Sequence, residues 1–199
     1  MADISFTPDY PGLRFYTQNE GTDAAIRICE YDGDIEVDGY VEFPIDGVDI
    51  FICTGRIRAT DVVRCCTNLV AQRGIDADGP IDVYGSIHCC SGGIRAGDGI
   101  WAGGRIDLRG GIDAEGPIEC LGIGCLDGDI RASGCIISEN EICTNSNIDC
   151  GKRIFAGVNL GATNKTCRNE IMCDQLLQGE VCCGVLAEGG TWVPEEGWC

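Results

Sequence analysis

The residues best suited to chemistry in this sequence are its 16 cysteines, because thiols form disulfides, bind metals and act as nucleophiles. No Cys-x-x-Cys pair occurs, and the adjacent pairs 65/66, 89/90 and 182/183 would alternate between the two sides of a strand, so both thiols of a pair rarely reach one ion. We therefore predict no metal site. Zinc held by the C-terminal cysteines stays open as an alternative; these are Cys167, Cys173, Cys182, Cys183 and Cys199.

The remaining chemistry-bearing residues do not form a recognisable catalytic set. His88 is the only histidine, which excludes sites built on two or more imidazoles. The sequence contains no Ser/His/Asp set, no phosphate-binding loop and no calcium-type glycine repeat. We predict no catalytic residues, no cofactor and no enzymatic activity.

The charge balance restricts the partners. The chain has 14 Lys and Arg against 32 Asp and Glu, a net charge of −18, whereas nucleic-acid binding needs clustered basic residues. No apolar run approaches the length of a transmembrane helix, and the first residues lack the features of a signal peptide. We expect protein partners, no nucleic acid and no membrane insertion. The expected location is the cytoplasm, or a virion assembled there, where thiol oxidation would also suit the cysteine content.

An aliphatic residue recurs every six positions, with a small or apolar residue two places later and often Gly four places later. This period-2 unit, Ile-x-Ala-x-Gly-x, predicts a short strand followed by a corner. One extra residue interrupts the six-residue spacing near His88–Gly93, and the hexad position at Gly124 holds no aliphatic residue. The aliphatic positions are 57, 63, 69, 75, 81 and 87, then 94, 100, 106, 112 and 118, then 130, 136, 142, 148, 154 and 160.

Every third hexad shares features that indicate a coil of 18 residues. The outward positions of these hexads alternate in sign: Arg58, Asp76, Arg95, Asp113, Arg131 and Asp149. Such alternation predicts that residues one coil apart stack at strand spacing, as a charge ladder that fixes register. The predicted fold is all-β: a single-stranded parallel β-solenoid with three faces, which we expect to be right-handed. Coils this short leave no loops to wall a catalytic cleft.

The hexad count also assigns side chains to the other two faces. Trp101, Ile137 and Phe155 fall at outward positions of one face, where stacked apolar groups indicate an interface. On the third face, Cys125 and Cys143 are 18 residues apart and both count as outward. Because neighbouring parallel strands lie about 4.8 Å apart, within the Cα range of roughly 4.4–6.8 Å that a disulfide requires, this pair is the disulfide candidate.

Segments at the two ends lack the clear repeat. We divide the chain into an N-terminal arm (1–30), the β-solenoid (31–187) and a C-terminal tail (188–199). The aromatic N-terminal segment either caps the open end of the core or docks another subunit. The tail carries Trp192 and Trp198, which either fold back over the last coil or bind a neighbour, so both are interface candidates.

Hexads such as Gly74–Gly85 (GIDADGPIDVYG) and the run GDIEVDGYVE from Gly33 resemble those of bactofilins. That resemblance covers roughly residues 33–162 and implies a compact triangular right-handed β-helix that forms cytoskeletal polymers. We therefore expect a non-enzymatic structural protein, a rigid building block of a filament or a virion. The alternative is a binding module or attachment fibre that presents one solenoid face to a ligand.

Overall fold

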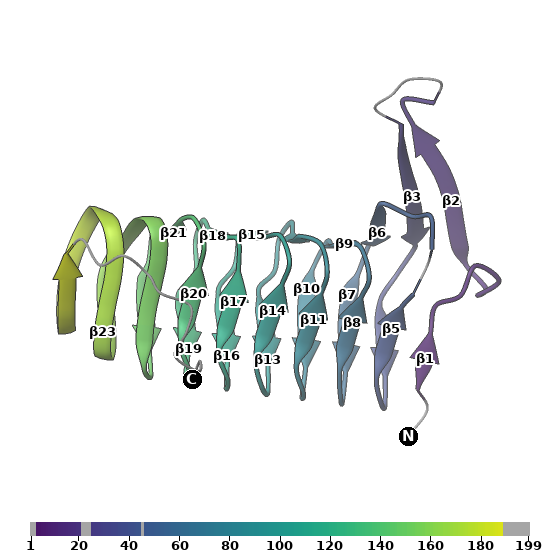
Figure 1. Ribbon diagram of the computed structural model, residues 1–199. Helices are drawn as coiled ribbons and strands as arrows, with labels where there is room; N and C mark the ends of the chain where they lie inside the picture. Colours follow the sequence, from purple (N-terminus) through teal and green to yellow (C-terminus); the bar gives the residue numbers. More distant parts are fainter. Residues whose placement is uncertain (1–2, 21–24, 45, 189–199) are drawn as a thin grey trace.

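A computed structural model of the chain describes residues 3–20, 25–44 and 46–188, with residues 163, 164 and 166–188 described by their backbone alone. The described chain forms strands and no helix, and it winds coil after coil into one long stack (Figure 1). None of the described residues belongs to a helix long and apolar enough to cross a membrane. The predicted all-β parallel solenoid with 18-residue coils is confirmed.

Three faces run along the stack, each a ladder of parallel strands. Face A contains β4 (Ile35–Val37), β7 (Arg56–Ala59), β10 (Gly74–Ala77), β13 (Ile94–Ala96), β16 (Ile112–Ala114), β19 (Ile130–Ala132) and β22 (Asn147–Cys150). Face B contains β1 (Ile4–Ser5), β5 (Val41–Phe43), β8 (Val63–Cys65), β11 (Ile81–Val83), β14 (Ile100–Ala102), β17 (Ile118–Cys120) and β20 (Ile136–Ser138).

Face C contains β3 (Ile26–Tyr31), β6 (Ile50–Cys53), β9 (Asn68–Ala71), β12 (Ile87–Cys89), β15 (Arg105–Leu108), β18 (Gly122–Cys125) and β21 (Ile142–Thr144). The long strand β23 (Arg153–Glu188) then pairs with the last strand of every face. Outside this arrangement, β2 (Leu13–Gln18) forms an antiparallel hairpin with β3.

The core follows from the period-2 pattern of the strands. In β16, Ile112 and Ala114 are buried while Asp113 between them is exposed, and the neighbouring strands of face A repeat this order. One aliphatic column and one small-residue column therefore run up the inside of each face. Together with the equivalent columns of faces B and C they form a single hydrophobic cluster along the stack.

Glycine at the corners allows the coils to stack closely. At the corner that precedes face A, a Cβ atom added to Gly93 would collide with the backbone oxygen of Gly111 on the next coil, and the same holds for Gly111 against Asp129. These corners also carry coil-to-coil hydrogen bonds, such as the one that the Ile94 amide donates to the Gly111 carbonyl at 3.0 Å. A side chain at these positions would separate the coils that these bonds join.

The predicted charge ladder on face A has the expected register. Glu36 lies opposite Arg58, and each later pair of opposite residues has opposite signs as far as Arg131 and Asp149. Within the described residues, however, only one ion pair forms inside the ladder, between Arg95 Nη1 and Asp76 Oδ1 at 3.5 Å. Arg131 instead contacts Asp129 of its own coil. A long exposed arginine side chain can pair with any of several nearby carboxylates. The ladder therefore helps to fix the register of the strands more than it adds ion-pair energy.

We expect Arg95→Asp to destabilise the solenoid by up to about 1 kcal/mol, because three carboxylates would then stand in a row at strand spacing. The loss should shrink at high salt, which screens exposed charges. Urea denaturation at low and high ionic strength measures it, with Arg109→Asp, an equal charge change at an exposed residue off the ladder, as the matched control. A loss independent of salt would contradict stacking of these side chains.

Candidate interface on face B and its surroundings

The predicted apolar stripe on face B is present in register. Trp101 of β14 lies opposite Glu119 of β17, Glu119 opposite Ile137 of β20, and Ile137 opposite Phe155 of β23. Trp101 is 39% exposed and its ring meets the exposed Tyr84 ring edge-on, with centroids 5.3 Å apart. Ile137 and Phe155 are half-buried. The sequence therefore placed these three interface candidates on one face, as expected.

The stripe surrounds a hollow of about 670 Å³. Its lining includes the stripe residues Trp101, Ile137 and Phe155, together with Cys120 and Leu121 at the end of β17. Two carboxylates, Glu119 and Glu139, also line the hollow, so a segment that fills it would meet mainly apolar surface with a carboxylate on each side of Ile137 in the sequence order of the lining. This arrangement suits aromatic or aliphatic side chains.

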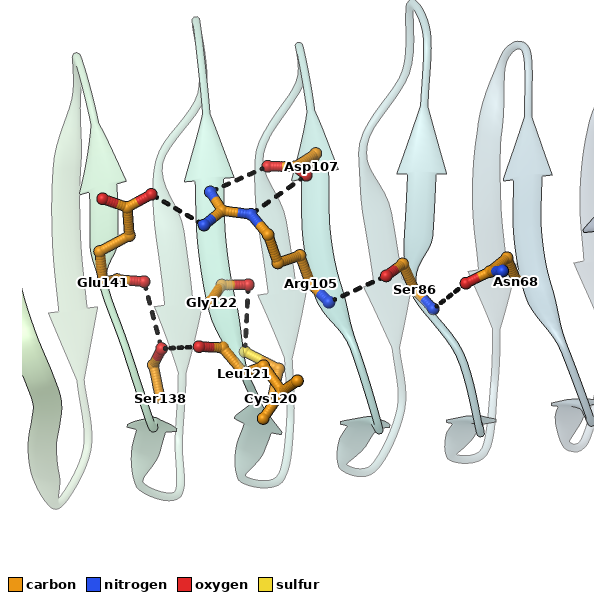
Figure 2. Close-up of polar contacts among 9 residues, drawn as sticks. All are labelled: Asn68, Ser86, Arg105, Asp107, Cys120, Leu121, Gly122, Ser138 and Glu141. Atoms are coloured by element: carbon orange, nitrogen blue, oxygen red, sulfur yellow. Dashed lines mark hydrogen bonds and ion pairs between the residues drawn. The ribbon is translucent and has the colours of Figure 1, made fainter. Parts of the chain in front are cut away.

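The corner between faces B and C is fixed by hydrogen bonds from side chain to backbone (Figure 2). The Ser86 amide donates to Asn68 Oδ1 at 2.8 Å, and on the next coil the Arg105 amide donates to Ser86 Oγ at 3.1 Å. Further along, the buried Ser138 hydroxyl lies 3.2 Å from the Leu121 carbonyl and 3.1 Å from the Glu141 carbonyl. The hollow on face B, which Leu121 lines, is thus bordered by a corner that these hydrogen bonds tie together.

Arg105 forms a clasp across this corner that sequence reasoning missed. Its Nη1 donates to Glu141, two coils away, at 2.8 Å, and its Nε donates to Asp107 at 3.4 Å (Figure 2). The hydrogen bond with Asp107, which has the larger effect, and the hydrogen bond with Glu141 both raise the pKa of Arg105 above its ordinary value. The guanidinium can cross the intervening coil because Gly122 has no side chain there: an added Cβ would lie 3.1 Å from Nη1. A contact 36 residues apart has no local signal in the sequence.

Five cysteines at inward strand positions fill the core as small apolar residues. Cys53, Cys65, Cys89, Cys120 and Cys150 are all buried. Burial raises the pKa of Cys65, Cys89 and Cys120 to about 12, so these thiols stay protonated near neutral pH and are poor nucleophiles. Among the residues with described side chains, no group of three or more His, Cys, Asp or Glu could hold a metal ion. The C-terminal cysteines considered for zinc lie outside the described side chains.

The predicted disulfide between Cys125 and Cys143 is wrong. The skipped hexad position is occupied by Ile123, which lies opposite Ile106 and Ile142, so Cys125 points into the core opposite Thr144. Cys143 faces out, opposite Gly124. The two thiols therefore lie on opposite sides of the sheet, and neither is bridged. The count failed because β18 is reached one residue early, which reverses which side chains face the core.

The N-terminal segment covers one end of the solenoid core, as one of its two predicted roles requires. Phe6, just after β1, is 1% exposed and packs against Phe43 and Phe51 with ring centroids 4.9 and 5.7 Å away, so it covers the end of the core. The hairpin of β2 and β3 projects from the stack (Figure 1), with Phe15 and Tyr16 exposed. The predicted boundary between residues 30 and 31 falls inside β3, which already pairs with β6 of the solenoid.

The two remaining interface candidates, Trp192 and Trp198, lie outside the described residues. The candidate interface on face B therefore consists of Trp101, Ile137 and Phe155 alone. Comparison with known proteins adds no assignment: no family model, no curated protein and no solved structure matches this chain.

Proposed function

We propose that this chain is a non-enzymatic structural protein, a rigid β-solenoid building block that assembles with copies of itself or with other structural subunits. The observation that carries the proposal is the uninterrupted parallel register of face A from β4 to β22, with every coil bonded to the next. Short corners replace the long loops with which β-helix enzymes build a cleft. Such a fold is compatible with a structural or assembly role.

The hairpin of β2 and β3 supplies a means of joining. In the described part of the chain β2 pairs with β3 alone, so its other edge presents backbone donors and acceptors of the kind that recruit another strand. Phe15 is 48% and Tyr16 is 40% exposed on this hairpin, which would add apolar contact to the paired edges. In our proposal the strand that pairs with this edge belongs to a second copy of the same chain.

The larger assembly that we propose is either a cytoplasmic polymer, in line with the resemblance to bactofilins, or a virion put together in the cytoplasm. Both need rigid repeating units that join through their ends or arms, and both fit an acidic chain with protein partners and no nucleic acid. The second candidate function, a binding module that presents face B to a ligand, is supported by the hollow beside Trp101.

Electron microscopy and light scattering of the purified full chain test the proposal. We expect filaments or ordered oligomers, and we expect the double variant Phe15→Ser and Tyr16→Ser to remain monomeric, because it removes the exposed aromatic surface beside the open edge. Leu126→Ser, which alters a residue that is 54% exposed elsewhere on the molecule, is the matched control and should assemble normally. Monomeric rods at every concentration would contradict self-assembly and favour the binding module.

A further inference from the structure

Cys135 differs from the other described cysteines in its bonding. It is disulfide-bonded, whereas ten other cysteines with described side chains are thiols. Cys135 is buried and directly precedes β20, whose outward residue Ile137 belongs to the stripe on face B. Its partner must therefore come from the five C-terminal cysteines and must reach the edge of face B.

The stacking of the coils excludes four of those five cysteines. Cys167 lies opposite Cys150, and Cys150 opposite Ala132 on the coil of Cys135, so two strand spacings, or about 10 Å, separate Cys167 from that coil. Disulfide Cα atoms lie no more than about 7 Å apart. Cys173, Cys182 and Cys183 lie later in β23, which winds onward from the end of the stack (Figure 1). Cys199, which follows β23 in the sequence, is the cysteine that remains.

The sequence between β23 and Cys199 complements the hollow on face B. Residues 189–199 read GGTWVPEEGWC, with two indoles, a valine and a proline for the apolar part of the hollow, and with Glu195 and Glu196, which must face solvent, away from Glu119 and Glu139. Eleven extended residues reach about 36 Å, well beyond the roughly three coils, at about 4.8 Å each, that separate the end of β23 from β20. A chain returning along face B crosses Phe155 and Ile137 before it reaches Cys135, and Trp198 then arrives beside the hollow.

We propose that the C-terminal segment 189–199 folds back along face B, fills the hollow between Trp101, Ile137 and Phe155, and is anchored by a disulfide between Cys135 and Cys199. Forming this bond removes one proton from each thiol and two electrons in all. The electrons pass to a low-molecular-weight disulfide by thiol exchange, which releases two small thiols. The occupant of the stripe is thus this chain itself, and the inference does not rest on the proposed function.

Peptide mapping of the full-length protein under non-reducing conditions tests the anchor. We expect the peptide that contains Cys135 to be joined to the one that ends at Cys199, and we expect reductant to separate them. A link from Cys135 to any other cysteine, or an alkylated Cys135 in the non-reduced protein, overturns the proposal.

Tryptophan fluorescence tests the docking separately. We expect Cys199→Ser, and independently Ile137→Glu, to shift the emission to longer wavelength and to increase quenching by acrylamide, because the indoles of the segment become exposed to water. Cys143→Ser, at a half-exposed thiol, is the control and should leave both unchanged. The docking is overturned if both test variants have the same emission as wild type. It is also overturned if the emission of wild type changes with protein concentration, because that would indicate that a second copy of the chain covers face B.

Discussion

Replacing Phe6 by alanine is expected to lower the free energy of unfolding by about 3–5 kcal/mol, the usual cost of removing a fully buried aromatic ring. The Phe6 ring is enclosed by four others: Tyr10 at 4.3 Å, Phe43 at 4.9 Å, Tyr31 at 5.6 Å and Phe51 at 5.7 Å between centroids. It closes the N-terminal end of the solenoid core, where no further coil covers Phe43 and Phe51. Its loss leaves a cavity and opens the first coil to water.

Phe15→Ala provides the matched control for this prediction. Phe15 stands on the same N-terminal segment, but its ring is 48% exposed on the hairpin, so its removal should change stability by no more than about 0.5 kcal/mol. Chemical denaturation of both variants measures the difference. Equal effects of the two substitutions would show that the segment around Phe6 is not a cap. A loss of assembly in Phe15→Ala without a loss of stability would assign the hairpin to docking.

Replacing Ala114 by leucine is expected to destabilise the protein by roughly 1–3 kcal/mol through overpacking. Ala114 is 3% exposed and lies in a column of alanines on face A, opposite Ala96 on one coil and Ala132 on the next. Three extra carbon atoms at this level have no space beside the isoleucine columns. Because the coils are stacked directly, a shift to accommodate leucine would disturb both neighbouring strands.

The adjacent residue gives the control for Ala114→Leu. Asp113 is exposed on the outer side of the same strand, so Asp113→Asn should stay within about 0.5 kcal/mol of wild type. Thermal or urea denaturation compares the two. A melting curve of Ala114→Leu that matches wild type would contradict the assignment of this column to the core.

The hexad pattern was sufficient to predict the coil because burial repeats with every coil. Each of the residues 57, 75, 94, 112, 130 and 148 meets its equivalent on the next coil, so one periodicity determines local strand, face and stacking together. The alternation of Arg and Asp added the coil length. For the same reason the hexad count alone places the stripe of Trp101, Ile137 and Phe155 on one face.

The pattern did not determine side-chain direction where the count was irregular. At β18 the aliphatic residue is Ile123, one position early, and this single step turned Cys125 from an expected surface thiol into a core residue. Nor did it reveal the Arg105 clasp, which depends on the absence of side chains at Gly122 and Gly124 on the coil between its partners. The sequence by itself determined the repeating coil, because core burial enforces one period along the chain. The tertiary structure alone decided the disulfide state of the cysteines and the cross-coil contacts, because these depend on which irregular residues the stacking brings together.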